Sequence, residues 1–228
     1  MEFLLRFLVL CLMAVTSMAC AGILRQGRPV FEGAVSFDTA VTRQVVEIRP
    51  SVQGNYKAKL TAWTYAGGIW IKTFGPWPVV IGRNGFAGAH EKREGDGKTP
   101  SGVYPIGLAF GKEDRLRTGL FYRRTMEDDI WVDDVTAVQY NRWAKLPTGV
   151  LSYEKMRRTD GLYDLGAVIE YNTDPVVPGY GSAIFIHIWR DHGHKPTAGC
   201  VALDAGRLRL LLEWLRSDMN PRIVLSGQ

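Results

Sequence analysis

The sequence predicts a mostly β fold with a single helix near its C-terminus. Seven tryptophans, nine tyrosines and 25 glycines in 228 residues favour strands joined by many turns. Several segments alternate polar and apolar residues as half-buried strands do, whereas one segment carries leucines at helical spacing. The length is sufficient for one domain with a full hydrophobic core.

Strand-like segments recur from Gln44 onward. Gly67-Gly68 predicts a hairpin turn, and Pro76-Trp77-Pro78 is expected to interrupt the strand that follows this turn. Residues 183–187 are nearly continuous in apolar side chains, which predicts a central, buried strand. The predicted strands cover residues 57–63, 69–74, 79–82, 103–109, 167–171, 183–187 and 222–225.

The predicted helix has a clear beginning, face and end. Asp204 is placed to cap its N-terminus, and Asn220-Pro221 is expected to end it. Its apolar face consists of Leu208, Leu211, Leu212 and Leu215.

Residues 92–102 are rich in turn formers and predict a long loop. Residues 112–165 lack periodicity, so we expect loops there, with a short helix near 153–158.

The N-terminus has the pattern of a secretory signal. Arg6 precedes an apolar stretch over 7–15, which is shorter than the ~20 residues of a transmembrane helix. Small residues follow, as at a cleavage site, at Ser17, Ala19 and Ala21. The predicted organisation is a signal peptide at 1–21, a tether or irregular lead-in at 22–43, and the folded domain at 44–228.

A lipoprotein signal is the alternative interpretation of the same segment. Cys20 would then become the acylated first residue, although Ser17-Met18-Ala19 before it lacks the usual leucine. Both interpretations predict an exported protein of the periplasm or cell envelope, and the second predicts a membrane-tethered lipoprotein.

The net charge of +5 comes from scattered basic residues without a nucleic-acid-binding motif, so nucleic acid is not an expected partner.

Cys200 is the one cysteine of the predicted folded domain, because Cys11 lies in the signal and Cys20 is removed or acylated. A lone cysteine in an exported chain cannot form an internal disulfide, so it is either an inert buried thiol or a nucleophile. A thiol that attacks an acyl carbon needs a nearby base and N–H donors for the developing oxyanion. His187 ends a predicted strand upstream, and Gly199 would let the backbone approach a substrate closely.

A zinc site is the competing interpretation of this segment. Its ligands would be Asp191, His192, His194 and Cys200. However, no HExxH or CxxC spacing supports a metal site, and we expect none.

Several separated motifs resemble, in order, the catalytic domain of the YkuD-type L,D-transpeptidases. Residues 184–187 and 196–203 resemble the family's catalytic motif, and residues 92–104 resemble its TPxGxF region. Further matches to one branch of the family lie at 131–134, 140–142, 162–164 and 171–179. The resemblance covers residues 45–226 and implies that the domain predicted at 44–228 is an L,D-transpeptidase catalytic domain with a β-sandwich and a packed C-terminal helix.

The resemblance also implies the roles of residues at the site. Cys200 would be the nucleophile, His187 the base, and the backbone amides of Gly199 and Cys200 the oxyanion hole. Many members carry Ser-His-Gly-Cys at the nucleophile, whereas Ala198 here replaces the second histidine, which leaves His187 as the favoured base. No cofactor is implied. Possible contacts to substrate are Arg83, Arg93, Thr197, His192 and His194, with solvated surface charge as the alternative for the arginines.

The implied activity is crosslinking of peptidoglycan stem peptides through a cysteine thioester. The branch resembled here suggests crosslinks other than the usual 3–3 type, such as 1–3. Two alternatives stay open from the sequence. An L,D-carboxypeptidase or endopeptidase would use the same Cys-His pair with water as the acceptor. A non-enzymatic peptidoglycan-binding protein is disfavoured by the presence of Cys200 and His187.

Overall fold

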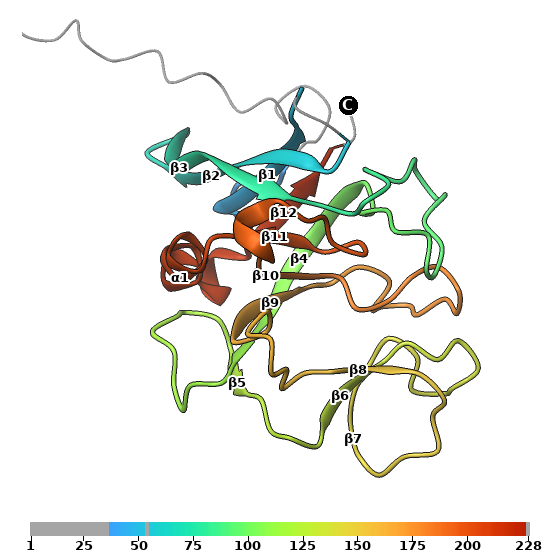
Figure 1. Cartoon of the computed structure of the whole chain (residues 1–228). Coiled ribbons are helices and arrows are strands. Elements are labelled where there is room, and N and C mark those ends of the chain that lie inside the picture. The colour runs from blue at the N-terminus through green and yellow to red at the C-terminus, as the bar shows by residue number, and fades with distance from the viewer. Residues whose placement is uncertain (1–36, 53–54, 227–228) are drawn as a thin grey trace, which may run out of the picture.

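A nine-stranded sheet forms the body of the computed structural model, which describes residues 37–52 and 55–226 (Figure 1). Its strands are β1 (Gln44–Pro50), β2 (Lys57–Ala66), β3 (Ile69–Val80), β4 (Gly102–Gly111), β5 (Tyr122–Arg124), β9 (Leu165–Ile169), β10 (Phe185–Ile188), β11 (Val201–Leu203) and β12 (Arg222–Leu225). They are ordered β12-β1-β2-β3-β11-β10-β9-β4-β5. The mostly β prediction is confirmed.

The sheet closes on itself, because β12 pairs in parallel with β1 and antiparallel with β4. The sandwich that the resemblance implies therefore takes the form of one continuous sheet around a core. Successive side chains of a strand point to opposite faces. In β10 and at the start of β11, Ile186 and Val201 belong to the main core, whereas Phe185 and Cys200 belong to a second cluster on the other face.

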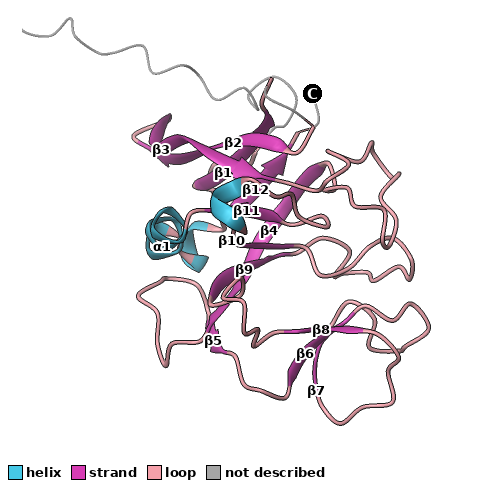
Figure 2. Ribbon diagram, viewed as in Figure 1, coloured by secondary structure: helices cyan, strands magenta, loops and turns pink. Residues whose placement is uncertain are grey.

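A small sheet covers that second cluster. It consists of β6 (Asp129–Val132), β7 (Trp143–Lys145) and β8 (Tyr153–Lys155), in the order β7-β6-β8. Figure 2 shows it below the main sheet, away from the helix α1 (Ala205–Trp214). Trp131 and Met156, from β6 and just after β8, pack in the cluster with Phe185 and Cys200. The small sheet therefore shields the thiol from solvent.

The helix α1 begins where Asp204 was expected to cap it. The Asp204 carboxylate accepts hydrogen bonds from the backbone N–H of Gly206 at 3.0 Å and of Arg207 at 3.2 Å. The predicted apolar face is buried in the main core at Leu208, Leu211, Leu212 and Leu215. The helix ends at Trp214, before the predicted Asn220-Pro221, and a 3-10 turn over Ser217–Met219 follows.

Replacing Asp204 with alanine should lower the free energy of unfolding by about 1 kcal/mol, because two backbone N–H groups lose their acceptor. Urea denaturation of the purified protein measures this difference. Asp218→Ala is the matched control, since Asp218 pairs with Arg216 at the surface and caps no α-helix. Equal losses of stability in the two variants would show that the cap at Asp204 contributes nothing specific.

The strand β3 runs through the prolines that were expected to interrupt it. Gly67 and Gly68 form the predicted hairpin turn, both with positive φ, and β3 then continues to Val80. Trp77 pairs with Leu60 across the hairpin, and the register of the two strands shifts at a bulge between Leu60 and Ala62. At this bulge a Cβ on Gly75 would lie 2.3 Å from the Leu60 carbonyl oxygen, so a side chain is excluded there. The prediction of an interruption is wrong because the bulge absorbs the irregularity.

Three further predictions are corrected, the first two of them by strand pairing. Residues 153–158 form no helix: Tyr153–Lys155 is the strand β8, which pairs with β6. Short strands also occur elsewhere in 112–165, where loops were expected. The central strand β10 begins at Phe185, two residues after the predicted start, because Ala183 has a left-handed backbone with φ of 54°.

The predictions for residues 1–21, and those for 22–43 up to residue 36, lie outside the described residues. This includes the signal peptide and the acylation of Cys20, which stay predictions. Among the helices of the described part of the chain, none has the length and apolar character needed to cross a membrane.

Candidate functional site

Cys200 lies immediately before β11, with 7% of its surface exposed. Its thiol donates to the Ala183 carbonyl oxygen at 3.2 Å, and its Sγ accepts from the Phe185 N–H at 3.3 Å. The sulfur is therefore held between a backbone acceptor and a backbone donor of the segment that enters β10. Such a thiol has a defined position, and its burial disfavours the charged thiolate form.

His187 lies in β10, with 6% of its surface exposed. Its Nδ1 is 2.8 Å from the Ile188 carbonyl oxygen. Because a carbonyl only accepts, Nδ1 carries the proton, and Nε2 of the neutral ring is left with a free lone pair. Backbone geometry thus presets the tautomer that a general base at Nε2 requires.

Strand register brings the two side chains to one face of the sheet. β10 and β11 are parallel neighbours, with Ile186 opposite Val201 and His187 opposite Ala202. Cys200 precedes Ala202 by two residues, so it points to the same face as His187, with about 8 Å between the two Cα atoms. Tyr163 contacts this pair, with its ring 5.2 Å from the His187 ring. In the described part of the chain no hydrogen bond joins Sγ to the imidazole.

Burial sets the resting protonation states of both groups. It lowers the pKa of His187 to about 4, and the positive charge of Arg158 adds to this effect. Burial raises the pKa of Cys200 to about 12, with a further contribution from the negative charge of Glu154. At neutral pH the resting site is therefore a neutral thiol beside a neutral imidazole, and not a thiolate–imidazolium pair.

The turn over residues 197–200 is closed by the Thr197 side chain. Its Oγ1 donates to the Cys200 carbonyl oxygen at 2.7 Å and accepts from the Gly199 N–H at 3.1 Å. The Cys200 N–H has no hydrogen-bond partner among the described residues, whereas the Gly199 N–H is already engaged. Of the two amides expected to form an oxyanion hole, that of Cys200 is the one free to accept a new partner.

Gly199 is required at its position by the close approach of another loop. Its φ is 158°, and a Cβ there would lie 2.9 Å from the Lys98 carbonyl oxygen and 3.2 Å from Ile184 Cδ1. Thr99 adds a direct link, since its Oγ1 donates to the Gly199 carbonyl oxygen at 2.7 Å. The loop over 92–102 therefore buttresses the turn that carries the thiol.

Gly199→Ala is expected to lower the rate of Cys200 acylation by roughly 10²-fold, because the clash with Lys98 displaces the turn and misplaces the nucleophile. Acylation is measured by intact-protein mass spectrometry with a stem-peptide donor. Gly67→Ala is the control: it has a positive φ of 58°, but a Cβ would meet nothing within 4 Å. Equal rates for Gly199→Ala and Gly67→Ala would contradict the buttressing role.

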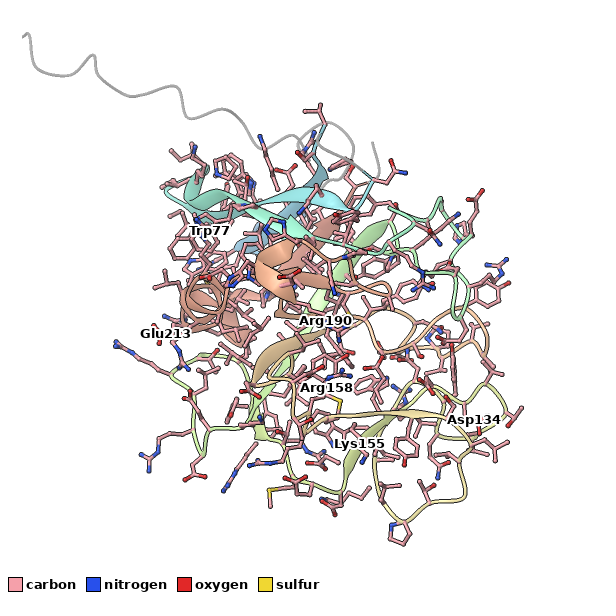
Figure 3. All side chains as sticks on the ribbon, viewed as in Figure 1. Trp77, Asp134, Lys155, Arg158, Arg190 and Glu213 are labelled. Carbon is pink, nitrogen blue, oxygen red and sulfur yellow. The ribbon has the colours of Figure 1, made fainter. Side chains whose placement is uncertain are left out.

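A charged network that sequence reasoning missed surrounds the His187 side of the site. The Tyr163 hydroxyl donates to Glu154, and the Arg158 guanidinium lies 5.1 Å from the Tyr163 ring centroid. Arg158 forms a bidentate ion pair with Asp160, which Arg190 approaches at 3.4 Å. Figure 3 shows Arg158 and Arg190 next to each other near the centre of the molecule. No local motif marks these residues, since they meet only in the folded chain.

The two arginines predicted as substrate contacts lie on loops beside the turn. The Arg83 backbone N–H donates to the Thr197 carbonyl oxygen at 3.0 Å, and its exposed side chain lies over Gly97. The exposed Arg93 side chain donates to the carbonyl oxygens of His90 and Lys92 and lies 4.4 Å from the Tyr180 ring centroid. Arg83 is therefore attached through its backbone to the turn that carries Cys200, whereas the Arg93 side chain is held within its own loop and against Tyr180.

His192 and His194 lie on the exposed loop between β10 and β11. The loop is attached to the main sheet through Tyr56, whose hydroxyl donates to the His194 carbonyl oxygen at 3.1 Å. Within residues 37–52 and 55–226, no three His, Cys, Asp or Glu side chains are grouped as metal ligands would be. The competing zinc interpretation of Asp191, His192, His194 and Cys200 therefore has no geometric support in this part of the chain.

The family model of the YkuD L,D-transpeptidase catalytic domain matches residues 51–224. The chain belongs to this family. Members of the family are peptidoglycan enzymes of the L,D-transpeptidase type, which act in the cell envelope.

One solved structure is similar at a lower level. The helical cell shape determining protein Pgp2 from Campylobacter jejuni is 16% identical, with a TM-score of 0.43. The match covers 82% of this chain and 51% of that one, so the chain spans about half the length of Pgp2. No curated protein matches the chain.

Within this L,D-transpeptidase domain the two main motifs are in direct contact. Thr99, from the TPxGxF region, hydrogen-bonds the Gly199 carbonyl oxygen and accepts from the Gly82 N–H at 2.9 Å. Asp96 shapes the loop before it, because its carboxylate accepts from the Lys92 ammonium and from the N–H groups of Arg93 and Lys98, each at 2.8 Å. The upstream motif is thus a support for the turn at Cys200.

Proposed function

We propose that this protein is a peptidoglycan L,D-transpeptidase that uses Cys200 as nucleophile and His187 as general base. The observation that supports this most directly is the placement of the two side chains on one face of adjacent strands, with the His187 tautomer set by the Ile188 carbonyl. A neutral imidazole with a free Nε2 is what is needed to take the proton of a neutral thiol.

In the proposed reaction, Sγ attacks a stem-peptide carbonyl carbon on the L-residue side of an L,D bond while His187 Nε2 takes the thiol proton. The Cys200 N–H donates to the oxyanion of the tetrahedral intermediate. The C–N bond then breaks, the amine leaves with the proton from Nε2, and a thioester remains. An amine of a second stem attacks the thioester carbonyl and its proton passes to Nε2. The C–S bond breaks as the new amide forms, and Sγ takes the proton from Nε2, which restores the thiol.

Shielding of the thiol favours an amine over water as acceptor. Cys200 is buried beneath the small sheet, in a cluster with Trp131 and Met156. A site that excludes water protects a thioester from hydrolysis until the acceptor arrives. Arg83 and Arg93 are proposed to bind stem carboxylates from the rim, since guanidinium groups suit carboxylates. The signal-like N-terminus supports export to the periplasm or cell envelope as part of the proposal.

The test is incubation of the purified protein with disaccharide-tetrapeptides, with products identified by tandem mass spectrometry. Dimers that have lost the residue after the donor carbonyl are expected, and fragmentation locates the crosslink as 3–3 or 1–3. Shortened monomers without dimers would overturn transfer in favour of hydrolysis. Absence of both products would overturn the enzymatic assignment on this substrate.

A further inference from the structure

The backbone that holds the Cys200 sulfur is itself in an unusual conformation. Ala183 has φ of 54°, a left-handed value that non-glycine residues rarely adopt because the Cβ crowds the backbone. This conformation directs the Ala183 carbonyl oxygen to the Cys200 thiol at 3.2 Å. The second group at the sulfur, the Phe185 N–H, belongs to β10 and is placed by strand pairing with Val168. Ala183 is therefore the member of this pair that needs separate support.

Asn141 supplies that support from the loop between β6 and β7. Its side-chain oxygen accepts from the Ala183 N–H at 3.1 Å and from Trp131 Nε1 at 2.9 Å. Its side-chain nitrogen donates to the carbonyl oxygens of Tyr171 at 3.1 Å and Asn172 at 2.7 Å. Asn141 is 1% exposed; its bonds with Trp131 and Ala183 are buried, and those to Tyr171 and Asn172 are partly buried. The amide orientation is unambiguous, because its two ends face donors and acceptors respectively.

The connection has a chemical consequence for the thiol. While Ala183 accepts the S–H, the sulfur is fixed at one point and its proton is retained. When His187 takes the proton, the Ala183 carbonyl no longer has a partner, whereas the Phe185 N–H becomes a charge-assisted donor to the thiolate. Deprotonation therefore removes the contact of the sulfur with Ala183 and keeps its contact with Phe185. The remaining contact sets the direction in which Sγ moves toward a substrate.

We propose that Asn141 is a positioning residue for the nucleophile: it keeps Ala183 left-handed so that the Ala183 carbonyl holds the Cys200 thiol in place. The role in catalysis rests on the proposed function, but the hold on the thiol does not depend on the substrate. A strained residue at a functional site persists only where its surroundings overdetermine it, and the four Asn141 hydrogen bonds provide such surroundings.

The main variant is Asn141→Ala. Without the Asn141 oxygen, Ala183 is expected to relax to a negative φ and its carbonyl to leave the thiol. The turnover number for stem-peptide transfer should fall by roughly 10²-fold with little change in KM, because the nucleophile is misplaced while the substrate surface is intact. Alkylation of Cys200 by iodoacetamide should become several-fold faster at neutral pH, because the thiol is no longer held under the carbonyl.

The decisive variant is Asn141→Ala with Ala183→Gly. Glycine adopts a left-handed conformation without the cost that alanine incurs, so it should restore the carbonyl hold without Asn141. About a tenfold recovery of turnover and a return of the alkylation rate toward the wild-type value are expected. Asn220→Ala is the matched control, since Asn220 is another asparagine with a left-handed backbone (φ of 44°) and its side chain donates to Thr42 instead of a group at the thiol; it should keep both rates. Asn141→Ser is the second variant if Asn141→Ala does not fold, with the same loss and rescue expected.

Two results would overturn the inference. One is an alkylation rate for Asn141→Ala equal to that of the wild-type protein, as mass spectrometry of Cys200 would show. The other is a double variant that recovers neither turnover nor the alkylation rate. Because alkylation needs no peptidoglycan, a wild-type protein inactive on stem peptides would refute the proposed function while leaving this test of the thiol hold intact.

Discussion

Cys200→Ala is expected to reduce stem-peptide transfer by about 10⁴-fold or more, because the proposed mechanism has no other group that can form the acyl-enzyme. The fold should persist, since the thiol is one small member of a cluster held together by aromatic rings such as Phe185 and Trp131. The measurement is dimer formation from disaccharide-tetrapeptides, with intact-protein mass spectrometry to detect the thioester. Thermal unfolding confirms that the variant is folded.

Met156→Leu is the matched control for this substitution. Met156 is a second buried sulfur-containing side chain of the same cluster, and leucine conserves its volume. Transfer by Met156→Leu should stay close to the wild-type rate. Retention of full activity by Cys200→Ala would refute the proposed mechanism. If a chelator then abolished the activity of this variant, the result would support the metal interpretation instead.

His187→Asn is expected to lower the acylation rate by roughly 10³-fold, because the thiol, whose pKa is raised to about 12, loses the group that takes its proton. In the wild-type protein the rate should fall as pH decreases through about 4, since burial lowers the pKa of His187 to that value and a protonated ring cannot accept a proton. Above this pH the ring is neutral and competent. Single-turnover acylation across pH, with thioester formation as the readout, measures both effects.

The control is His90→Asn, at an exposed histidine whose φ of 63° asparagine tolerates. It should keep both the rate and the acidic limb near pH 4. His187→Asn should lose that limb together with most of its rate. An unchanged acidic limb in His187→Asn would show that a different group accepts the thiol proton.

Several features were predictable because they depend on neighbours in the sequence. The hairpin at Gly67-Gly68, the helix behind Asp204 and the strand that carries His187 follow from local turn, cap and periodicity signals. The family resemblance implied Cys200 and His187 as a pair, with His187 at the end of a predicted strand and Cys200 after the loop that follows it. Their presence on one face then follows from strand alternation.

Other features depend on partners that are distant in the sequence. β8 is a strand because it pairs with β6, and its own residues favoured a helix. The shield over Cys200 exists because Trp131 and Met156 reach it from the small sheet. Arg158 and Arg190 meet through Asp160 only in the folded chain.

The sequence by itself determined the fold class, the candidate nucleophile and the candidate base. Only the tertiary structure decided how the thiol is held. Residue 183 was predicted to lie in a strand, as its apolar neighbours suggest, yet a hydrogen bond from its N–H to Asn141, 42 residues away, supports a left-handed backbone there. Local propensity acts through adjacent residues, whereas this contact forms only after two separate sheets have packed together, and for that reason no local pattern announces it.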